Sequence, residues 1–472
     1  MKKRFIEWDL PLAEISEESA REKNIRHGHI STLHIWWARK PLAASRVTSF
    51  AALIDLPDDE EKRGEIYELI KKMAPWEAIS DGNDVNIEKA RKMIKKQWDE
   101  PPKVLDPFSG GGSIPLEALR LGCETYSNDY NPVAVLIEKC TLEYPQKYGI
   151  KKETKEWGGM RVSGKNQLLE DVMKWGEWVL DEVKDEIGKF YQEELNDPIS
   201  VGYYWLKTIK CQNPTCCAII PLASNWWLSN KSNKKVACKP VVSGKEIKFE
   251  IIMENFGDFD PNDGTIAGAN AVCPVCHQVT EAKKVRELAQ SGKMGQRMVA
   301  VVLNHLKKRG KIYRIANEKD MEIFRKAEKY LGEKRQRLMD ELGLDPVPDE
   351  PTPEGKGRGA ERAFSVRNYS LNIWGDLFNS RQKLALITFS EKIRQVHKRM
   401  LTEGIEEEYA KAVVSYLALV LNRLAMFSTT LCRWKSGTEQ NIPLFSGRMV
   451  LPMIFDYFEV VPTGKISTSW IN

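Results

Sequence analysis

The residues best suited to chemistry in this 472-residue sequence lie in one stretch, Lys103 to Pro132. It reads KVLDPFSGGGSIPLEALRLGCETYSNDYNP: a short apolar run, an acid, three glycines, an amphipathic run and a second acid. Glycines at 110–112 permit positive φ and let a ligand approach the backbone without meeting a Cβ atom. Asp129 follows Asp106 by 23 residues, a spacing that can bring a carboxylate to ribose hydroxyls. The stretch therefore predicts a site for a nucleoside cofactor.

Three elements must position these residues. A strand at Val104-Leu105 is bounded by the Pro101-Pro102 pair, which a central strand does not tolerate. A helix with an apolar face runs to Gly122, and a second strand is expected at 124–127. A turn between a strand and a packed helix would give the same pattern. The loop is not G-x-G-x-x-G and lacks the Lys-Ser/Thr of a P-loop, so neither a dinucleotide nor a nucleoside triphosphate is favoured.

A second set of residues suits a metal. The sequence has nine cysteines, and two close pairs stand out, Cys211-x4-Cys216 and Cys273-Pro-Val-Cys276. Two such pairs can converge on one tetrahedral site, and four thiolates leave no position open for a substrate, which predicts structural zinc. Cys217 lies beside Cys216, so either of these two can be the ligand. Buried thiols that are spaced this way by chance are the alternative.

Composition sets further bounds. The length predicts two to four domains, and 42% hydrophobic with 29% charged residues is typical of a globular protein with a large core. The net charge of +5 is too small to indicate nucleic-acid binding by itself. No apolar run approaches about 18 residues, so no membrane span is expected. The N-terminus has basic residues without an apolar region behind them, so no secretion signal is expected and the predicted location is the cytoplasm.

The segment 26–46, RHGHISTLHIWWARKPLAASR, is unusual for its three histidines and its adjacent tryptophans. Its histidines are either surface residues or ligands of a metal, although no acid or cysteine lies among them. Its tryptophans and its Lys-Pro pair are better explained by a neighbouring site, as the next comparison indicates.

These motifs resemble a known family. DPFSGGGS resembles the S-adenosylmethionine loop of the amino-methylating DNA methyltransferases, and NDYNPVA resembles their second cofactor motif. Together with SAREKNIRHGHISTLHIWWARKPLAASR, they closely resemble the prokaryotic adenine-specific DNA methylases that contain a zinc ribbon and begin with a DUF1156-type domain. The resemblance extends over most of the chain.

The resemblance implies an α/β fold: a Rossmann-like S-adenosylmethionine-dependent methyltransferase core, with a sheet that can be incomplete, helical insertions and a zinc-ribbon insertion. It also implies that a segment with Trp36 or Trp37 closes over the methionine end of the cofactor. The cofactor-binding residues that it implies are Asp106, Pro107, Phe108, Gly110, Gly111, Gly112, Asp129, Asn131, Trp37, Lys40 and Pro41. The metal ligands are Cys211, Cys216, Cys273 and Cys276.

The expected domain organisation follows composition, motifs and the resemblance. The segments are a DUF1156-like N-terminal segment with the cofactor-closing motif (1–55), a helical insertion (56–100), the cofactor-binding βαβ unit (101–160), a helical connector (161–200), the zinc ribbon (201–285), a basic helical region (286–345), a linker (346–362) and a helical region leading into a missing catalytic part (363–472). Arg433-Trp434-Lys435 in the last segment is either a nucleic-acid contact or a partly exposed core tryptophan.

One expected motif is absent from the sequence. In the amino-methylating DNA methyltransferases that the chain resembles, an Asp/Asn-Pro-Pro-Tyr/Phe loop accepts hydrogen bonds from the exocyclic amine, and its aromatic residue stacks on the flipped base. The chain has no such tetrapeptide, so no catalytic residue is predicted. The resemblance therefore implies a truncated, frameshifted or split DNA adenine-N6 methyltransferase, with DNA and a second polypeptide carrying the catalytic loop as partners. Its role would be in restriction–modification or anti-phage defence. A non-catalytic DNA-binding or scaffolding subunit and an RNA methylase are the alternatives.

Overall fold

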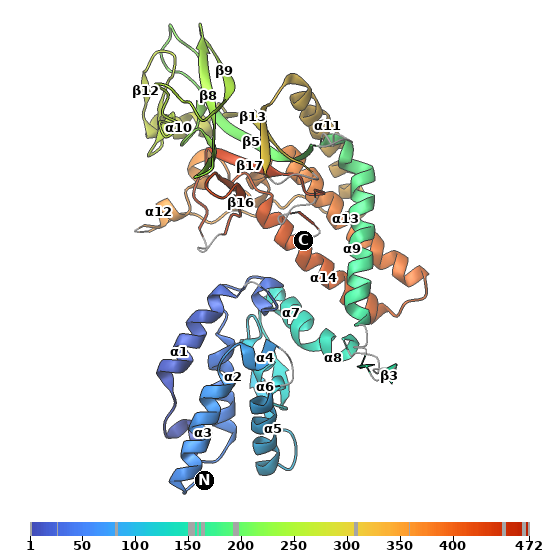
Figure 1. The fold of residues 1–472 in the computed structure, drawn as a ribbon. Helices are drawn as coiled ribbons and strands as arrows, with labels where there is room; N and C mark the ends of the chain where they lie inside the picture. The colour runs from blue at the N-terminus through green and yellow to red at the C-terminus, as the bar shows by residue number, and fades with distance from the viewer. Residues whose placement is uncertain are drawn as a thin grey trace. The chain divides into compact units, whose positions relative to one another are not determined.

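The chain is a mixed α/β protein in two compact units (Figure 1). The computed structural model describes residues 2–25, 27–80, 84–149, 156–157, 160–161, 166–191, 198–305, 310–357, 359–445, 450–464 and 469–470. The N-terminal unit comprises residues 1–173 and 403–419, and the C-terminal unit comprises residues 174–402 and 420–472. Two helices contribute residues to both units, α9 (Gln167–Ile187) and α14 (Glu407–Phe427).

The N-terminal unit is mainly helical. Its other elements are η1 (Phe5–Glu7), α1 (Leu12–Arg21), η2 (Glu22–Asn24), η3 (Ile30–Thr32), α2 (Leu42–Leu53), α3 (Glu60–Met73), α4 (Glu77–Ser80), α5 (Val85–Gln97), β1 (Lys103–Asp106), α6 (Ser113–Arg120), β2 (Glu124–Ser127), α7 (Pro132–Glu138), η4 (Lys139–Glu143), α8 (Tyr144–Tyr148), β3 (Glu156–Trp157) and β4 (Met160–Arg161). Residues 56–100, expected to be a helical insertion, contain the helices α3 to α5. Apolar residues of α2, α3, α5 and α6 share one core, with Phe50 and Ile70 fully buried.

Two buried acids fix α2 within this core. Glu117 on α6 and Arg46 on α2 are both fully buried, and Arg46 Nε lies 3.2 Å from Glu117 Oε2. The carboxylate of Glu22 accepts the backbone N–H groups of Leu42 and Ala43 at 2.8 and 2.7 Å, which caps the first turn of α2. The packing of α2 on α6 therefore holds the N-terminal segment beside the glycine loop that precedes α6.

The C-terminal unit contains a five-stranded antiparallel sheet. Its elements are η5 (Gly188–Phe190), β5 (Ile199–Lys210), β6 (Ile219–Leu222), β7 (Trp227–Lys231), β8 (Lys234–Ser243), β9 (Glu246–Met253), β10 (Ile266–Ala267), β11 (Asn270–Val272), β12 (Val279–Thr280), α10 (Ala282–Gln290), β13 (Gly295–Asn304), β14 (Lys311–Ile315), α11 (Glu318–Leu342), α12 (Ala360–Ala363), η6 (Val366–Tyr369), η7 (Trp374–Leu377), α13 (Ser380–Thr402), β15 (Arg433–Lys435), β16 (Gln440–Ile442) and β17 (Asp456–Val460). The sheet order is β14-β13-β5-β17, and β6 also pairs with β5 (Figure 1).

The long strand β5 organises this sheet. Its sequence, ISVGYYWLKTIK, is rich in β-branched and aromatic residues, and most of them are buried. Trp205 of β5 stacks on Tyr457 of β17, with ring centroids 6.0 Å apart. Strands β7, β8 and β9 form a separate antiparallel sheet, and the β8–β9 hairpin is the long green hairpin in Figure 1.

Three parts of the expected organisation differ from the structure. The region 286–345, expected to be helical, contains β13 and β14 before α11, because the buried run 298–303 is apolar at every position and such a run does not separate strand from helix. The region 363–472 contributes β17 to the central sheet. The expected linker at 346–362 is anchored through Thr352, which is 1% exposed and whose hydroxyl donates to the Leu371 carbonyl at 2.9 Å.

A buried ion pair lies at the centre of the C-terminal unit. Arg381 on α13 is 1% exposed and Glu459 on β17 is 0% exposed. Arg381 Nε donates to Glu459 Oε1 at 2.7 Å and its Nη2 donates to Glu459 Oε2 at 2.9 Å. The indole N–H of Trp205 donates to the same carboxylate at 2.8 Å, so α13 is tied to the middle of the sheet.

A second buried carboxylate closes the β15–β16 hairpin. Glu439 is 4% exposed, and its Oε1 accepts from Lys234 Nζ and from the Tyr313 hydroxyl, both at 2.7 Å. Lys231 donates to its other oxygen. Burial alone would raise the pKa of Glu439, but hydrogen bonds from Lys231, Lys234 and Tyr313 lower it to about 2.

We expect Glu439 to make the C-terminal unit sensitive to acid. Because its pKa is about 2 in the folded state and 4.5 is the usual value, the stabilisation is complete above pH 4.5 and is lost as the pH falls from 4.5 toward 2. The loss should be on the order of 2–3 kcal/mol. Chemical denaturation at pH 6 and pH 3 should show a smaller acid-induced loss in Glu439→Gln than in the wild type. The exposed Glu246→Gln is the control, and equal losses in all three proteins would contradict the assignment.

Helix α14 is long and apolar enough to cross a membrane, with a mean hydropathy of 1.4 over an 18-residue window. About a third of that window is buried inside the structure, and core helices of folded proteins satisfy the same criterion. It is the one such helix among the described residues. No apolar run of about 18 residues was expected from the sequence, whereas α14 reaches the length and mean hydropathy of a membrane-spanning helix.

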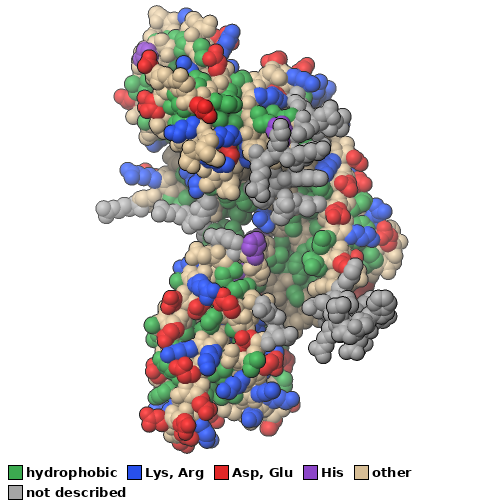
Figure 2. All heavy atoms as spheres, in the orientation of Figure 1, with side chains coloured by type: hydrophobic (Ala, Val, Ile, Leu, Met, Phe, Trp, Pro, Cys, Tyr) green, Lys and Arg blue, Asp and Glu red, His purple; other side chains and the backbone are tan. Residues whose placement is uncertain are grey.

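Charged side chains of both signs are mixed on the face of the molecule that Figure 2 shows. In Figure 2, lysine and arginine are interspersed with aspartate and glutamate on the visible face of each unit. This agrees with the small net charge of the chain, +5. Any preference for a polyanion must therefore come from a local arrangement of side chains.

Candidate cofactor loop and metal centre

The glycine segment folds as the sequence predicts, into a strand, loop, helix and strand. Strands β1 and β2 are parallel, with Lys103 opposite Glu124 and Asp106 opposite Ser127. They form the one parallel pair among the strands of the described residues. The loop 107–112 connects β1 to α6, and Gly110 and Gly112 have φ of 54° and 73°. These left-handed backbone angles explain two of the three glycines.

Asp129 lies against the glycine loop. Its Oδ2 accepts the backbone N–H of Gly110 at 2.9 Å and its Oδ1 accepts the backbone N–H of Asn131 at 2.8 Å. Asp129 is partly exposed, and an ionised carboxylate has about four acceptor positions, so two remain for a ligand. Asp106 accepts the N–H of Phe108 at 3.2 Å, and it is partly buried at the carboxyl end of β1.

The loop depends on residues that the sequence did not single out. The hydroxyl of Ser109 donates to Glu138 Oε1 at 2.7 Å and lies 2.8 Å from the Ser127 hydroxyl. Its backbone N–H donates to the carbonyl of Asn128 at 3.0 Å. Glu138 is only 5% exposed on the apolar helix α7. A buried glutamate in an apolar run is a sequence signal for a polar partner, since such a group is rarely left unpaired.

The N-terminal segment covers the glycines through Trp36 and Arg39. A Cβ atom at Gly110 would lie 2.5 Å from Trp36 Nε1, and one at Gly111 would lie 2.9 Å from Arg39 Cζ. Arg39 Nη1 donates to the Gly111 carbonyl at 2.9 Å, and its Nη2 donates to the His34 carbonyl at 3.2 Å. Burial lowers the pKa of Arg39 to about 10.

The predicted closing residues Trp37, Lys40 and Pro41 adjoin Trp36 and Arg39 in the chain. Trp37 is 47% exposed and Lys40 is exposed, whereas Pro41 is the N-cap of α2. A turn in which the Arg39 N–H donates to the Trp36 carbonyl brings residues three apart to the same side. For this reason the segment contacts the loop through Trp36 and Arg39.

We expect the two covered glycines to be intolerant of substitution. Gly110→Ala combines strain at φ 54° with the contact to Trp36 and should cost the N-terminal unit about 2–3 kcal/mol. Gly122→Ala is the matched control, because its φ is 88° but nothing lies within 4 Å of a Cβ there. It should cost only about 1 kcal/mol. Chemical denaturation measures both, and equal costs would show that Trp36 does not confine the loop.

The β1–β2 pair exposes an apolar surface beside the loop. Leu105 and Tyr126 are partners in register, so their side chains lie on one face, and they are 67% and 48% exposed. Phe108 is 82% exposed and Tyr130 is 97% exposed at the carboxyl ends of the strands. Parallel sheets are ordinarily covered on both faces. This pair has one face open to solvent.

Four cysteines converge in the C-terminal unit. The sulfur atoms of Cys211, Cys216, Cys273 and Cys276 all lie within 4.8 Å of one another. Cys211 Sγ lies 3.6 Å from Cys276 Sγ, and Cys216 Sγ lies 3.8 Å from Cys273 Sγ. Four sulfurs that bind one tetrahedral zinc at 2.3 Å would lie about 3.8 Å apart, so the cluster fits such a metal.

Backbone geometry distinguishes Cys216 from Cys217 and repeats in the second pair. The residue after the second cysteine of each pair has positive φ, 57° at Cys217 and 59° at His277. The sulfur of Cys217 instead lies 3.2 Å from the Pro214 carbonyl. The structure thus places Cys216 in the cluster and leaves Cys217 outside it.

The electrostatics of the cluster suit a bound cation. The backbone N–H of Gln278 lowers the pKa of the Cys276 thiol to about 7, whereas burial raises that of Cys211 to about 12. The positive charge of a bound metal would therefore be needed to deprotonate the more buried thiol, that of Cys211. Among the described residues, this is the one group of histidine, cysteine, aspartate and glutamate side chains close enough to bind a metal, and the N-terminal histidines do not form another.

Comparison with known proteins adds one finding. Residues 9–76 match the family model DUF1156, a family of unknown function. The match includes α1, α2 and α3, and it contains both Trp36 and Arg39, which cover the glycine loop. No curated protein and no solved structure matches the chain. The N-terminal part of the chain is therefore similar to DUF1156 proteins.

Proposed function

We propose that the chain is the S-adenosylmethionine-binding polypeptide of a DNA adenine-N6 methyltransferase. The observation that carries this proposal is the position of Asp129, which lies after β2 and contacts the glycine loop that follows β1. A ligand with a hydroxylated ribose and a charged amino-acid end would need both groups within reach of one another. The sequence motifs DPFSGGGS and NDYNPVA supply the choice of cofactor.

The residues around the loop fit such a cofactor in part. The free acceptor positions of Asp129 suit ribose hydroxyls, and Asp106 suits the ammonium group. The exposed ring of Phe108, with Asn131 and Pro132, would line the base. Trp36 and Arg39 already occupy the space beside Gly110 and Gly111, so ligand atoms can reach these glycines only from another side.

In the proposed reaction, the main role of this chain would be to bind and orient the cofactor. S-adenosylmethionine supplies an electrophilic methyl group on its sulfonium, and the exocyclic amine of adenine accepts it by in-line displacement. The residues of the loop would orient the cofactor, and Trp36 would exclude water from its methionine end. Holding the amine in line is the task of the absent Asp/Asn-Pro-Pro-Tyr/Phe loop.

We propose that a second polypeptide provides that loop together with further strands. The two-stranded parallel pair supports this proposal, because parallel pairs are rarely stable without neighbouring strands and cover. The exposed face with Leu105 and Tyr126 is where additional strands and helices would pack. The four-cysteine cluster would then be a structural zinc site of the C-terminal unit.

A non-catalytic DNA-binding or scaffolding subunit is the second candidate. It is favoured by the same loop contacts, because Asp129 already accepts two backbone N–H groups and the glycines already pack on Trp36. In that case the βαβ unit is a structural element, and the Asp129 carboxylate serves to hold the glycine loop in place.

Methyl transfer to DNA separates these candidates. The chain would be assayed with tritiated S-adenosylmethionine and unmethylated DNA, alone and after coexpression with a polypeptide encoded beside it that carries Asp/Asn-Pro-Pro-Tyr/Phe. The proposal predicts N6-methyladenine only when both are present, and none when Asp129 is replaced by alanine. Methylation unaffected by Asp129→Ala, or DNA binding by the chain without any methylation in the pair, would favour the scaffold.

A further inference from the structure

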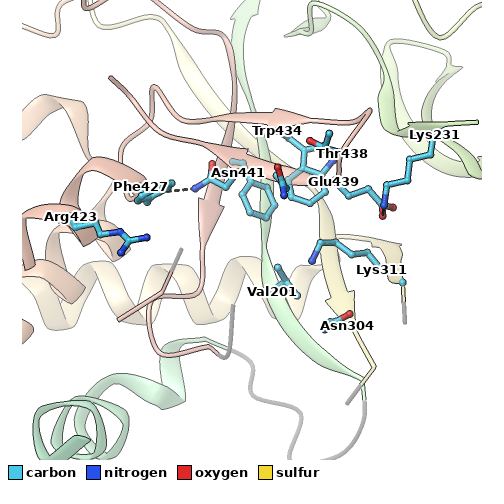
Figure 3. Close-up of a pocket in the computed structure, with 13 residues that line it drawn as sticks. Val201, Lys231, Asn304, Lys311, Arg423, Phe427, Trp434, Thr438, Glu439 and Asn441 are labelled. Carbon is cyan, nitrogen blue, oxygen red and sulfur yellow. Dashed lines mark hydrogen bonds and ion pairs between the residues drawn. The ribbon is translucent and has the colours of Figure 1, made fainter. Parts of the chain in front are cut away.

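A cavity in the C-terminal unit lies apart from the glycine loop and from the four-cysteine cluster. Its volume is about 590 Å³, within the usual range of small-molecule sites. Figure 3 shows side chains from several elements around it. Its lining residues come from β5, β7, β13, the start of β14, α14, the β15–β16 hairpin and β17.

Two cations of the cavity form no ion pair among the described residues. Lys311 and Arg423 line it, and their charged ends are directed toward the space between them in Figure 3. Neither makes an ion pair with a described carboxylate. Burial lowers the pKa of Lys311 although Glu439 is close enough to oppose the shift. An anion would relieve the cost of this desolvated ammonium group.

Glu439, the one acid among the described residues that line the cavity, is already neutralised. Glu439 is bound by Lys231, Lys234 and Tyr313, as described above. These two lysines exceed its single negative charge, and Lys311 and Arg423 add two further positive charges. The cavity is therefore net positive despite the carboxylate in its wall.

Fixed aromatic rings provide the apolar part of the wall. Trp434 is held by its indole N–H, which donates to the Leu228 carbonyl at 2.6 Å. Its ring centroid lies 4.5 Å from that of Phe458. Phe427 lines the cavity from α14. A rigid aromatic surface beside unpaired cations suits a planar base that carries a phosphate.

A buried amide and a strained turn adjoin the rings. The Nδ2 of Asn441 donates to the Phe427 carbonyl at 2.9 Å, whereas its Oδ1 is buried without a donor among the described residues (Figure 3). Asn441 is 7% exposed. The neighbouring Glu439 has φ of 52°, a left-handed angle that is costly for a non-glycine residue and is often found at binding sites.

We propose that this cavity binds a nucleotide, with Lys311 and Arg423 contacting its phosphate and Trp434 contacting its base. The nucleotide is either free or one unit of a single-stranded DNA, because both present the same phosphate and base. Binding of single-stranded DNA rests on the proposed function, in which the chain acts on DNA, whereas binding of a free nucleotide does not. Neither requires S-adenosylmethionine or methyl transfer, so a failure here is separate from a failure of the proposed function.

Binding of two probes to the full chain tests the proposal. Adenosine 5′-monophosphate would be titrated by calorimetry, and a fluorescent six-nucleotide single-stranded DNA by anisotropy. Arg423→Gln and Lys311→Gln should each weaken binding at least about tenfold, since each removes a charge-assisted contact. The controls are Arg394→Gln and Lys283→Gln, which replace exposed cations outside the cavity and should leave both affinities unchanged. Circular dichroism would establish that each variant is folded.

The outcomes also distinguish the source of the nucleotide. Binding of the monophosphate alone, lost in the cavity variants, supports a free nucleotide. Binding of the oligonucleotide with the same losses, and a salt dependence reduced by about one ion in each variant, supports a strand. The proposal is overturned if neither probe binds, or if the cavity variants bind as well as Arg394→Gln and Lys283→Gln.

Discussion

Serine in place of Cys273 is expected to abolish metal binding at the four-cysteine cluster and to unfold the part of the C-terminal unit that surrounds it. The cluster lies in a core with Ile209, Ile220 and Leu288, and its sulfurs join the segment between β5 and β6 to the segment between β11 and β12. A structural zinc contributes on the order of 10 kcal/mol to folding, which is comparable with the whole stability of a domain. The variant should therefore lose cooperative unfolding of this region as well as its metal.

Metal content and thermal unfolding, measured on the same preparation, check this expectation. The wild type should contain one zinc per chain, and Cys273→Ser should contain none. Cys217→Ser is the matched control, since the Cys217 sulfur lies outside the cluster, and it should retain one zinc and the wild-type unfolding temperature. A stable, zinc-free wild-type chain would show that the four thiols are merely buried neighbours.

Methionine in place of Arg381 is expected to destabilise the C-terminal unit by about 3–5 kcal/mol, because it leaves the Glu459 carboxylate buried without a counter-charge. Besides the two hydrogen bonds to Glu459, Arg381 donates to the Phe190 carbonyl at 3.1 Å, and its Cζ lies 3.9 Å from the Tyr203 ring centroid. Burial alone would lower the pKa of Arg381, but the Glu459 carboxylate raises it, so Arg381 is charged in the folded state.

A double-mutant cycle separates the cost of the unpaired charge from the loss of packing. Arg381→Met with Glu459→Met should be much less destabilising than Arg381→Met alone, because no buried charge remains. The exposed Arg394→Met should change stability by less than about 0.5 kcal/mol. Additive effects of the two substitutions in chemical denaturation would contradict the view that the pair acts as a unit.

The local architecture of the glycine segment was predictable because it rests on short-range signals. Pro102, the glycines and Gly122 mark the ends of β1, α6 and β2, and the structure has these elements as expected. The convergence of the cysteine pairs was also predictable from their spacing. Such signals are local in the sequence, so they can be interpreted without knowledge of tertiary contacts.

Features that depend on contacts between distant segments of the chain were harder to predict from the sequence. The run 298–303 is apolar at every position, so its period does not tell a buried strand from a buried helix, and only pairing with β5 makes it β13. The contact of Trp36 and Arg39 with Gly110 and Gly111 joins segments about 70 residues apart, and adjacent Trp37 was an equally suitable choice. The cavity proposed to bind a nucleotide draws on many elements, and of the lining residues that the proposal uses, only Trp434 belongs to a motif named in the sequence, Arg433-Trp434-Lys435.

Calorimetric titration of the purified chain with S-adenosylmethionine tests the central claim most directly, with zinc assayed on the same sample. The account predicts binding of one cofactor per chain that Asp129→Ala abolishes and Asp99→Ala leaves unchanged. Asp129→Asn, which keeps an acceptor for the glycine loop, separates loss of ribose contacts from collapse of the loop, and it too should bind weakly. A folded, zinc-loaded chain that binds no S-adenosylmethionine, or that binds it equally well without the Asp129 carboxylate, would contradict the claim.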